Sequence, residues 1–179
     1  MKKTFWLVLY YGFARFLPES HTFWGRMFGS LKFRQLCCKH IFKYMGENVN
    51  IEHAAWFGNG QNIEIGDNSG IGINAHILSN TKIGKNVMMG PNCYMLESVH
   101  LYDRIDIPMM EQGRKTISDQ VIIGDDVWIG QDVMIIGSRE IKTGSIVGAR
   151  CVLVKSFPEY SIIGGNPSQL IRSRKQSIG

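Results

Sequence analysis

The chain has 179 residues, of which 44% are hydrophobic and 20% charged, so it can bury the core of a globular domain. Its formal charge of +5 comes from 20 cationic and 15 anionic side chains spread along the sequence. No run of basic residues indicates a nucleic-acid partner, and the excess weakly favours phosphate-bearing ligands or membrane surfaces. The four cysteines form no CxxC pair, and we interpret Cys93 and Cys151 as small core residues, which fits a reducing compartment.

Residues 1–44 predict a helical arm. The opening MKKTFWLVLYYGFA resembles a signal peptide superficially, but it lacks a small-x-small cleavage site and is too short to span a bilayer. We therefore expect a retained arm on a cytoplasmic protein, with a break at Pro18 and a second helix near 28–44. A contact of residues 1–17 with a membrane surface stays open, because the segment is rich in aromatic residues, and the location would then be the membrane's inner face.

From residue 45 the hydrophobic pattern repeats every six residues. Residues 65–100 read IGDNSG, IGINAH, ILSNTK, IGKNVM, MGPNCY and MLESVH, with a large apolar residue at the first place and a small or β-branched one at the fifth. A period of six fits neither a helix nor a two-sided strand, but it fits a short strand plus a turn. Gly at the second place and Asn or Asp at the third and fourth allow the turns, because they tolerate left-handed backbone.

The hexads also run over 45–62 and from 117 onward, sixteen in all. Three hexads would close one triangular coil, so the chain predicts a mainly β solenoid of about five coils with both inward places in one core. The expected parts are the arm (1–44), the solenoid (45–164) and a C-terminal tail (165–179). Residues 101–116 depart from the repeat and are expected to project as a loop.

Five segments carry a resemblance to a known family: IGINAHI (71–77), GPNCYMLESVH (90–100), DIPMMEQG (106–113), IGDDVWIGQDVMI (123–135) and the stretch from VGARC to RSR (147–174). With them the chain resembles the hexapeptide-repeat acyltransferases. The nearest branch is that of the sugar O-acetyltransferases, which includes galactoside, maltose and polysaccharide-modifying enzymes. The resemblance implies a left-handed parallel β-helix and a homotrimer with active sites between subunits.

The resemblance also assigns roles on the acceptor side. His100 matches the general base, which suits an imidazole because its pKa lies near neutrality. Asn74 matches an asparagine that contacts the acceptor or supports the tetrahedral intermediate, although an ordinary turn asparagine is an equal alternative. Glu97 is a candidate to orient the imidazole. The loop offers four candidate sugar ligands, Tyr102, Asp103, Arg104 and Gln112.

Acetyl-CoA is the donor that the resemblance implies, with no metal. Its groove would be lined by Gly90, Trp128, Gly130, Gly148 and Ala149, and its phosphates reached by Lys155 and Arg172. Arg174 is a further candidate for the phosphates.

The sequence thus predicts an acetyl-CoA-dependent O-acetyltransferase that modifies a sugar hydroxyl in capsule, O-antigen or exopolysaccharide assembly. One alternative is an N-acetyltransferase of a nucleotide-linked amino sugar, because amine and hydroxyl need the same base. A second is a non-catalytic β-helix scaffold with a membrane-docking arm. A metal hydratase on the same solenoid is disfavoured, because His53, His76 and His100 include no close pair.

Overall fold

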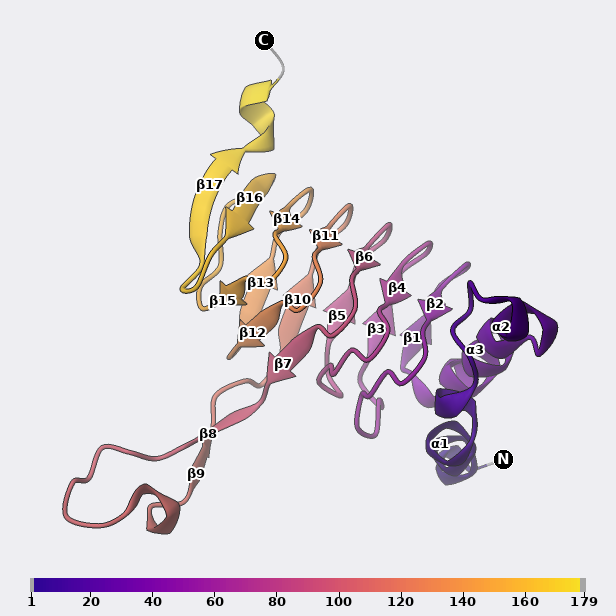
Figure 1. Ribbon diagram of the computed structural model, residues 1–179, viewed down its shortest axis with the longest axis horizontal. Coiled ribbons are helices and arrows are strands. Elements are labelled where there is room, and N and C mark those ends of the chain that lie inside the picture. Colours follow the sequence, from indigo (N-terminus) through magenta and orange to yellow (C-terminus); the bar gives the residue numbers. More distant parts are fainter. Residues whose placement is uncertain (1, 178–179) are drawn as a thin grey trace.

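The structure is a computed structural model that describes residues 2–177, in which a cap of helices precedes a stack of short strands (Figure 1). The cap consists of helix α1 (Lys3–Gly12), the 3₁₀-helix η1 (Ala14–Phe16), helix α2 (Phe23–Met27) and helix α3 (Ser30–Ile41). The strands that follow are β1 (Tyr44–Met45), β2 (Asn50–Ile51), β3 (Glu64–Ile65), β4 (Gly70–Ile71), β5 (Lys82–Ile83), β6 (Met88–Met89), β7 (Tyr94–Leu96), β8 (Ser98–His100), β9 (Arg114–Thr116), β10 (Val121–Ile123), β11 (Trp128–Ile129), β12 (Met134–Ile136), β13 (Arg139–Ile141), β14 (Ile146–Val147), β15 (Val152–Leu153), β16 (Ser161–Gly164) and β17 (Gln169–Ser173). Two further 3₁₀-helices are η2 (Met109–Glu111) and η3 (Arg174–Ser177).

Parallel ladders run along the three sides of the stack. The first side pairs β1, β3, β5, β10 and β13 in that order. The second side holds two ladders, one of β2 and β4 and one of β6, β11, β14 and β16. The third side pairs β7, β12 and β15, and single bridges extend it from Tyr94 to His76 and Trp56. From β1 to β7 and from β10 to β16, consecutive strands therefore lie on different sides, and the ladders join one coil to the next, as the six-residue period predicts. Strand β17 instead returns antiparallel to β16.

The interior of the stack is built from the first and fifth places of the hexads. First-place residues are stacked in register, as in Ile65, Ile83, Ile123 and Ile141. Fifth-place residues such as Ala75 and Val127 are equally buried. The prediction that both places face the axis is thus confirmed for most hexads.

The turns depend on two places of the hexad for different reasons. The fourth place adopts the left-handed conformation, with φ between 53° and 58° at Asn48, Asn68, Asn74, Asn86, Asn92, Asp126 and Asp132. Apart from Gly58, which has φ 58°, the second-place glycines have no positive φ. A Cβ on them would meet the next coil, at 2.8 Å from the Gly84 carbonyl carbon for Gly66 and 2.5 Å from the Ala149 nitrogen for Gly130. The expectation that second-place glycines serve the turn conformation is therefore wrong except at Gly58. They are required because adjacent coils stack closely.

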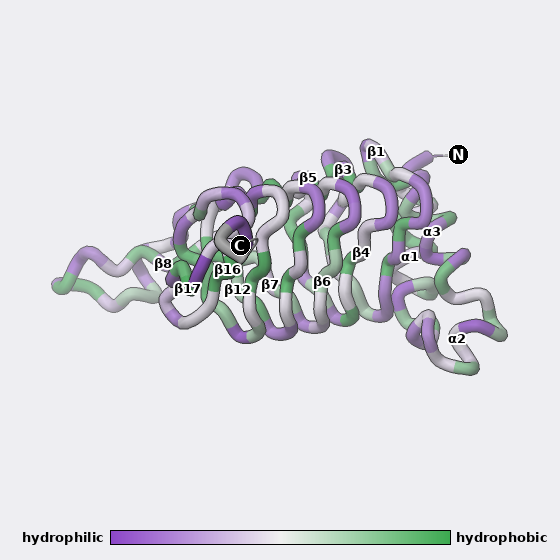
Figure 2. Tube along the Cα trace, turned by 90° about the horizontal axis from the view of Figure 1, so that it is seen from above, coloured by the Kyte–Doolittle hydropathy of each residue, from purple (hydrophilic) through white to green (hydrophobic). Residues whose placement is uncertain are grey.

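One corner of the stack is irregular and releases an antiparallel hairpin. Strands β8 and β9 pair His100 with Arg114, and residues 101–113 form the loop between them. Figure 1 shows this hairpin extending away from the stack, at the end opposite the helices. In Figure 2 the turns of the stack are mostly hydrophilic, whereas the strands between them are more hydrophobic.

The arm closes the open end of the first coils. The Tyr10 hydroxyl donates to the Ala55 carbonyl at 3.0 Å, and its ring lies 4.5 Å from that of Phe57. Trp6 and Tyr10 are buried in the shared core, so these two aromatic residues of segment 1–17 do not face a membrane. No helix among residues 2–177 is both long enough and apolar enough to cross a bilayer.

Candidate active site

His100 stands exposed at the end of β8, where the chain leaves the stack. Its cross-strand partner Arg114 places Nε 3.2 Å from His100 Nε2, and the guanidinium N–H donates to that nitrogen. An arginine can only donate, so Nε2 of His100 is the acceptor in this contact. No feature of the sequence points to Arg114, because the register of a hairpin does not follow from a six-residue repeat.

The loop beyond His100 is held together by its own polar side chains. Arg104 forms an ion pair with Asp106, which lowers the pKa of that carboxyl group. The Gln112 side chain accepts from the Arg104 N–H at 3.1 Å and donates to the Arg104 carbonyl at 2.8 Å. Arg104 and Gln112, two of the predicted sugar ligands, thus shape the loop. The other two, Tyr102 and Asp103, lie exposed on its surface.

Glu97 and Asn74 take positions that favour structural roles. The Glu97 carbonyl accepts from the N–H groups of Ile117 and Ser118, at 2.8 Å and 3.1 Å, which closes the root of the hairpin. Its carboxylate acts on the pKa of His76, which burial lowers despite that charge. Asn74 has φ 58° and donates from Nδ2 to Asn92 Oδ1 at 3.2 Å, as part of a ladder of turn side chains.

Trp128 lies on the second side of the stack, with half of its side chain exposed. It lines a hollow of about 130 Å³ with Met88, Asp126, Ile146 and Arg174. Arg174 reaches this hollow from the C-terminal tail and is held by Asp126, at 3.2 Å, and by the Gly144 carbonyl. An exposed indole beside a fixed cation is the kind of surface that a phosphate-bearing coenzyme needs. Arg174 is thus as good a candidate for the coenzyme phosphates as Lys155 and Arg172.

The remaining coenzyme candidates lie on nearby corners of the same coils. Gly90 and Gly130 are packed against the backbone of the following coil, so stacking alone accounts for them. Gly148 and Ala149 lie on the next coil, and Ala149 is exposed. Lys155 is exposed with Nζ 5.4 Å from the Phe157 ring centroid, and Arg172 is exposed on β17 opposite Ile162.

The two halves of the predicted site do not meet within one ladder. His100 follows β7 of the third side, whereas Trp128 belongs to the second side. The other two histidines of the stack have contacts of their own: His53 Nδ1 lies 2.9 Å from the Leu17 carbonyl oxygen, and His76 is stacked between Trp56 and Tyr94. Within the part of the chain that the structure describes, no three His, Cys, Asp or Glu side chains are grouped to hold a metal ion.

Known proteins share both the repeat and the fold. Residues 62–96 match the family model of the bacterial transferase hexapeptide (six repeats). An Escherichia coli K12 protein named for an O-acetyl transferase of lipopolysaccharide biosynthesis, WbbJ, is 34% identical over 71 residues, which are 39% of this chain and 36% of that protein. The chain spans only about a quarter to about a third of the length of the curated relatives it matches.

Solved structures align over much more of the chain. A maltose O-acetyltransferase from Clostridium difficile 630 is 29% identical, with a TM-score of 0.67 and coverage of 79% of this chain and 75% of that one. Galactoside acetyltransferase in complex with coenzyme A is 27% identical, with a TM-score of 0.74 and coverage of 96% and 80%. The chain therefore carries hexapeptide repeats on the left-handed β-helix fold and resembles the sugar O-acetyltransferases, as its motifs predict.

Proposed function

We propose that the chain is an acetyl-CoA-dependent O-acetyltransferase that modifies a sugar hydroxyl, with His100 as the general base. The observation that carries the proposal is the exposed imidazole at the hairpin root, whose Nε2 is an acceptor. The likeness to galactoside and maltose acetyltransferases supports the sugar as acceptor, and the coenzyme A complex of the former supports the donor. The name of WbbJ supports a place in polysaccharide modification.

In the proposed reaction the Nε2 lone pair of His100 takes the proton of the acceptor hydroxyl. The alkoxide oxygen then attacks the thioester carbonyl carbon, and a tetrahedral intermediate forms. Its collapse breaks the C–S bond, and the imidazolium returns the proton to the departing thiolate. Arg114 must release Nε2 for this step, and its guanidinium then stays beside the acceptor. Asn74 keeps a second amide N–H that can donate to the oxyanion.

The coenzyme would lie along the side of the stack that carries Trp128, with Arg174, Lys155 and Arg172 toward its phosphates. Because His100 and Trp128 belong to different sides of one chain, we infer that the complete site needs a second subunit. The homotrimer that the resemblance implies would supply that subunit. We propose that the chain is divided as the sequence predicts. The arm (1–44) caps the stack, the β-helix (45–164) carries both half-sites, and the tail (165–179) borders the coenzyme.

Release of free thiol from acetyl-CoA tests the proposal across free sugars, nucleotide sugars, amino sugars and oligosaccharides. We expect His100→Ala to lower acceptor-dependent turnover by about 10²- to 10⁴-fold, the usual contribution of a general base, while coenzyme binding persists. His21→Ala is the matched control, because it removes an exposed imidazole on the arm. Equal turnover by His100→Ala and the wild type would remove His100 as the base.

The acceptor panel also separates the alternatives. Turnover confined to nucleotide-linked amino sugars would replace O-acetylation with N-acetylation by the same base. No turnover with any acceptor, together with no coenzyme binding in a titration, would overturn acyl transfer. The non-catalytic scaffold would then be the remaining hypothesis.

A further inference from the structure

An exposed apolar patch lies on the part of the arm between α1 and α3. Its members are large hydrophobic side chains that are each between 54% and 72% exposed: Phe13, Phe16, Phe23, Trp24, Met27 and Phe28. We call these six residues the aromatic patch. Isolated exposed apolar residues are normal on a protein surface, but a contiguous group of this kind marks an interaction site.

The patch is continuous from one element to the next. The Trp24 ring is stacked on Phe28 at 5.9 Å and meets Phe23 edge-on at 5.3 Å. Phe28 also lines an apolar groove of about 340 Å³ together with Phe13 and Phe16. The patch thus joins α2 to the 3₁₀-helix η1 across a shallow depression.

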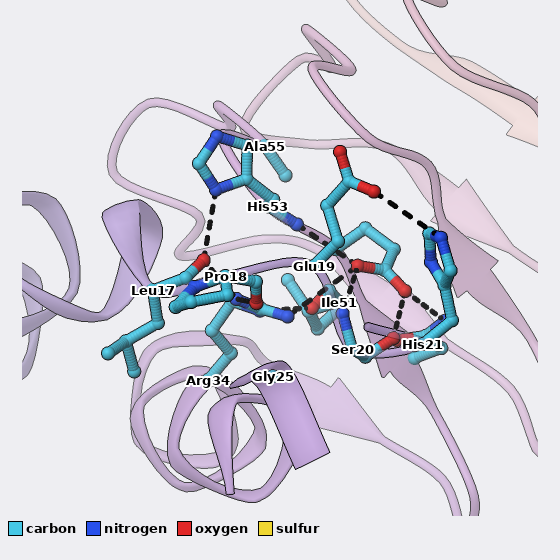
Figure 3. Close-up of polar contacts among 12 residues, drawn as sticks. Leu17, Pro18, Glu19, Ser20, His21, Gly25, Arg34, Ile51, His53 and Ala55 are labelled. Carbon is cyan, nitrogen blue, oxygen red and sulfur yellow. Dashed lines mark hydrogen bonds and ion pairs between the residues drawn. The ribbon is translucent and has the colours of Figure 1, made fainter. Parts of the chain in front are cut away.

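A buried arginine holds this segment rigidly on the β-helix (Figure 3). Arg34 is fully buried, and it donates from Nη1 to the Leu17 and Pro18 carbonyls, at 3.0 Å and 3.1 Å, and from Nε to the Ile51 carbonyl at 2.6 Å. Glu52 accepts from the Ser20 N–H at 3.1 Å and lies 3.5 Å from Arg34 Nη2. The aromatic patch is therefore preorganised and not the tip of a loose tail.

The arm also carries more positive charge than the chain as a whole. Residues 1–46 hold eight Lys and Arg against one Glu, which gives +7, and the remaining residues hold twelve against fourteen acidic ones, which gives −2. Arg26 and Lys32 line a hollow of about 270 Å³ beside α2. Lys32 and Lys39 border a second hollow, of about 510 Å³, between α3 and the first coil. The single carboxylate, Glu19, lies 3.5 Å from His21.

We propose that the aromatic patch and its surrounding cations dock the protein on the surface of an anionic bilayer. Phe and Trp side chains enter the headgroup region of a membrane, while Arg and Lys beside them attract anionic lipids. The charge separates this occupant from an apolar protein partner, because exposed cations such as Arg26, Lys32 and Lys39 are complementary to an anionic surface and repel a second copy of the arm.

The docking face overlaps only in part with the segment 1–17 that the sequence left open for membrane contact. Phe13 and Phe16 belong to both, but Trp6 and Tyr10 of α1 are buried and α2 supplies half of the patch. In Figure 1 the helices occupy one end of the stack, and the hairpin and the last coils lie toward the other end. Docking through the arm would therefore leave the hairpin and β17 free on the side away from the bilayer. The inference does not depend on the proposed acyl transfer.

Flotation of the full chain with vesicles tests the docking. We expect the protein to float with phosphatidylcholine vesicles that contain phosphatidylserine, and not with pure phosphatidylcholine vesicles. We expect the bound fraction to fall as salt rises, because salt screens the attraction. The variant Phe23→Ser, Trp24→Ser, Phe28→Ser should lose at least about tenfold in partitioning.

Two matched controls separate the patch from general surface effects. The variant Ile105→Ser, Met109→Ser, Met110→Ser also removes three exposed apolar side chains, but on the hairpin loop, and should float like the wild type. The charge variant Arg26→Glu, Lys32→Glu should lose about tenfold or more, whereas Lys82→Glu, Lys115→Glu, which makes the same change on the stack and hairpin, should lose much less.

Three results would overturn the proposal. The first is that the wild type does not float with anionic vesicles. The second is that the patch variant floats as well as the wild type. The third is that the patch variant changes the molar mass of the protein in solution without changing flotation, and the patch would then be a subunit interface. Circular dichroism melting of each variant shows that a loss of flotation is not a loss of fold.

Discussion

At the scale of single residues, the guanidinium of Arg34 decides how firmly the arm is held. We predict that Arg34→Ala lowers the free energy of unfolding by about 3–5 kcal/mol, because it leaves buried carbonyl groups and the Glu52 carboxylate without their partner. Arg150→Ala is the control, since Arg150 pairs with Asp132 while 83% exposed, and should change stability by no more than about 0.5 kcal/mol. Urea unfolding measures both, and similar losses would contradict a special role for Arg34.

The residues of the candidate site differ in how far the sequence could predict them. His100 and Trp128 stand in motifs, and the structure leaves both exposed. Arg114 was missed, because it meets His100 through the register of a hairpin outside the repeat. Asn74 fits the motif, yet its left-handed turn and its bond to Asn92 are shared by asparagines at the same place of other hexads. The repeat places asparagine here because the turn needs it, so a catalytic role of Asn74 needs a separate test.

At the scale of elements, alanine should have different effects at Gly66, in the second place of its hexad, and at Gly70, in the sixth place of the same hexad. Gly66→Ala should lower the free energy of unfolding by about 1–3 kcal/mol, because its Cβ would lie 2.8 Å from the backbone of the next coil. Gly70→Ala should be neutral or slightly stabilising, because its Cβ would lie 3.6 Å from the Asn50 carbonyl oxygen, an ordinary contact. The denaturant midpoints of the two variants and the wild type measure this difference. An equal loss for both would mean that backbone conformation, not stacking, requires these glycines.

The elements show why the solenoid was predictable and its ends were not. A hexad contacts mainly the hexads above and below it, so the period of six carries the ladders and the inward places directly. Where the repeat is interrupted, the period predicts nothing. Strands β8 and β9 leave the stack as a hairpin, and Ile63, one of two residues inserted between the hexads that end at 62 and begin at 65, is buried. The arm was predicted as helical, but its packing depends on long-range contacts such as that of Tyr10 with Ala55. Nothing local in the sequence encodes them.

At the scale of the whole molecule, the junction between arm and β-helix should respond to acid through Glu52. Burial alone would raise the pKa of Glu52, but hydrogen bonds from Ser20, Asn50 and the His53 N–H lower it below its usual value. A lowered pKa contributes stability above the unfolded value of about 4.3, and that contribution is lost as pH falls through the folded value. We therefore predict that the urea midpoint of the wild type falls between about pH 5 and pH 3 by more than that of Glu52→Gln.

Asp106→Asn is the control for this acid response. The Asp106 pKa is also lowered, by its Arg104 partner, but both side chains are exposed on the hairpin, so solvent screens the pair. Its pH response should match that of the wild type. A Glu52→Gln protein with an unchanged pH dependence would show that the carboxylate does not link the arm to the β-helix.

The assembly offers the sharpest test of the split site, because His100 and Trp128 lie on different sides of one chain. One variant, His100→Ala, lacks the base, and a second, Trp128→Ala with Ala149→Glu, blocks the proposed coenzyme groove. If each site joins the base of one subunit to the groove of the next, an equal mixture reassembled from unfolded chains contains intact sites. For random assembly about a quarter of the sites regain both parts, so turnover should return to about a quarter of the wild-type value. Turnover that stays at the level of the separate variants would place base and groove in one subunit, and the chain would then act without a shared site.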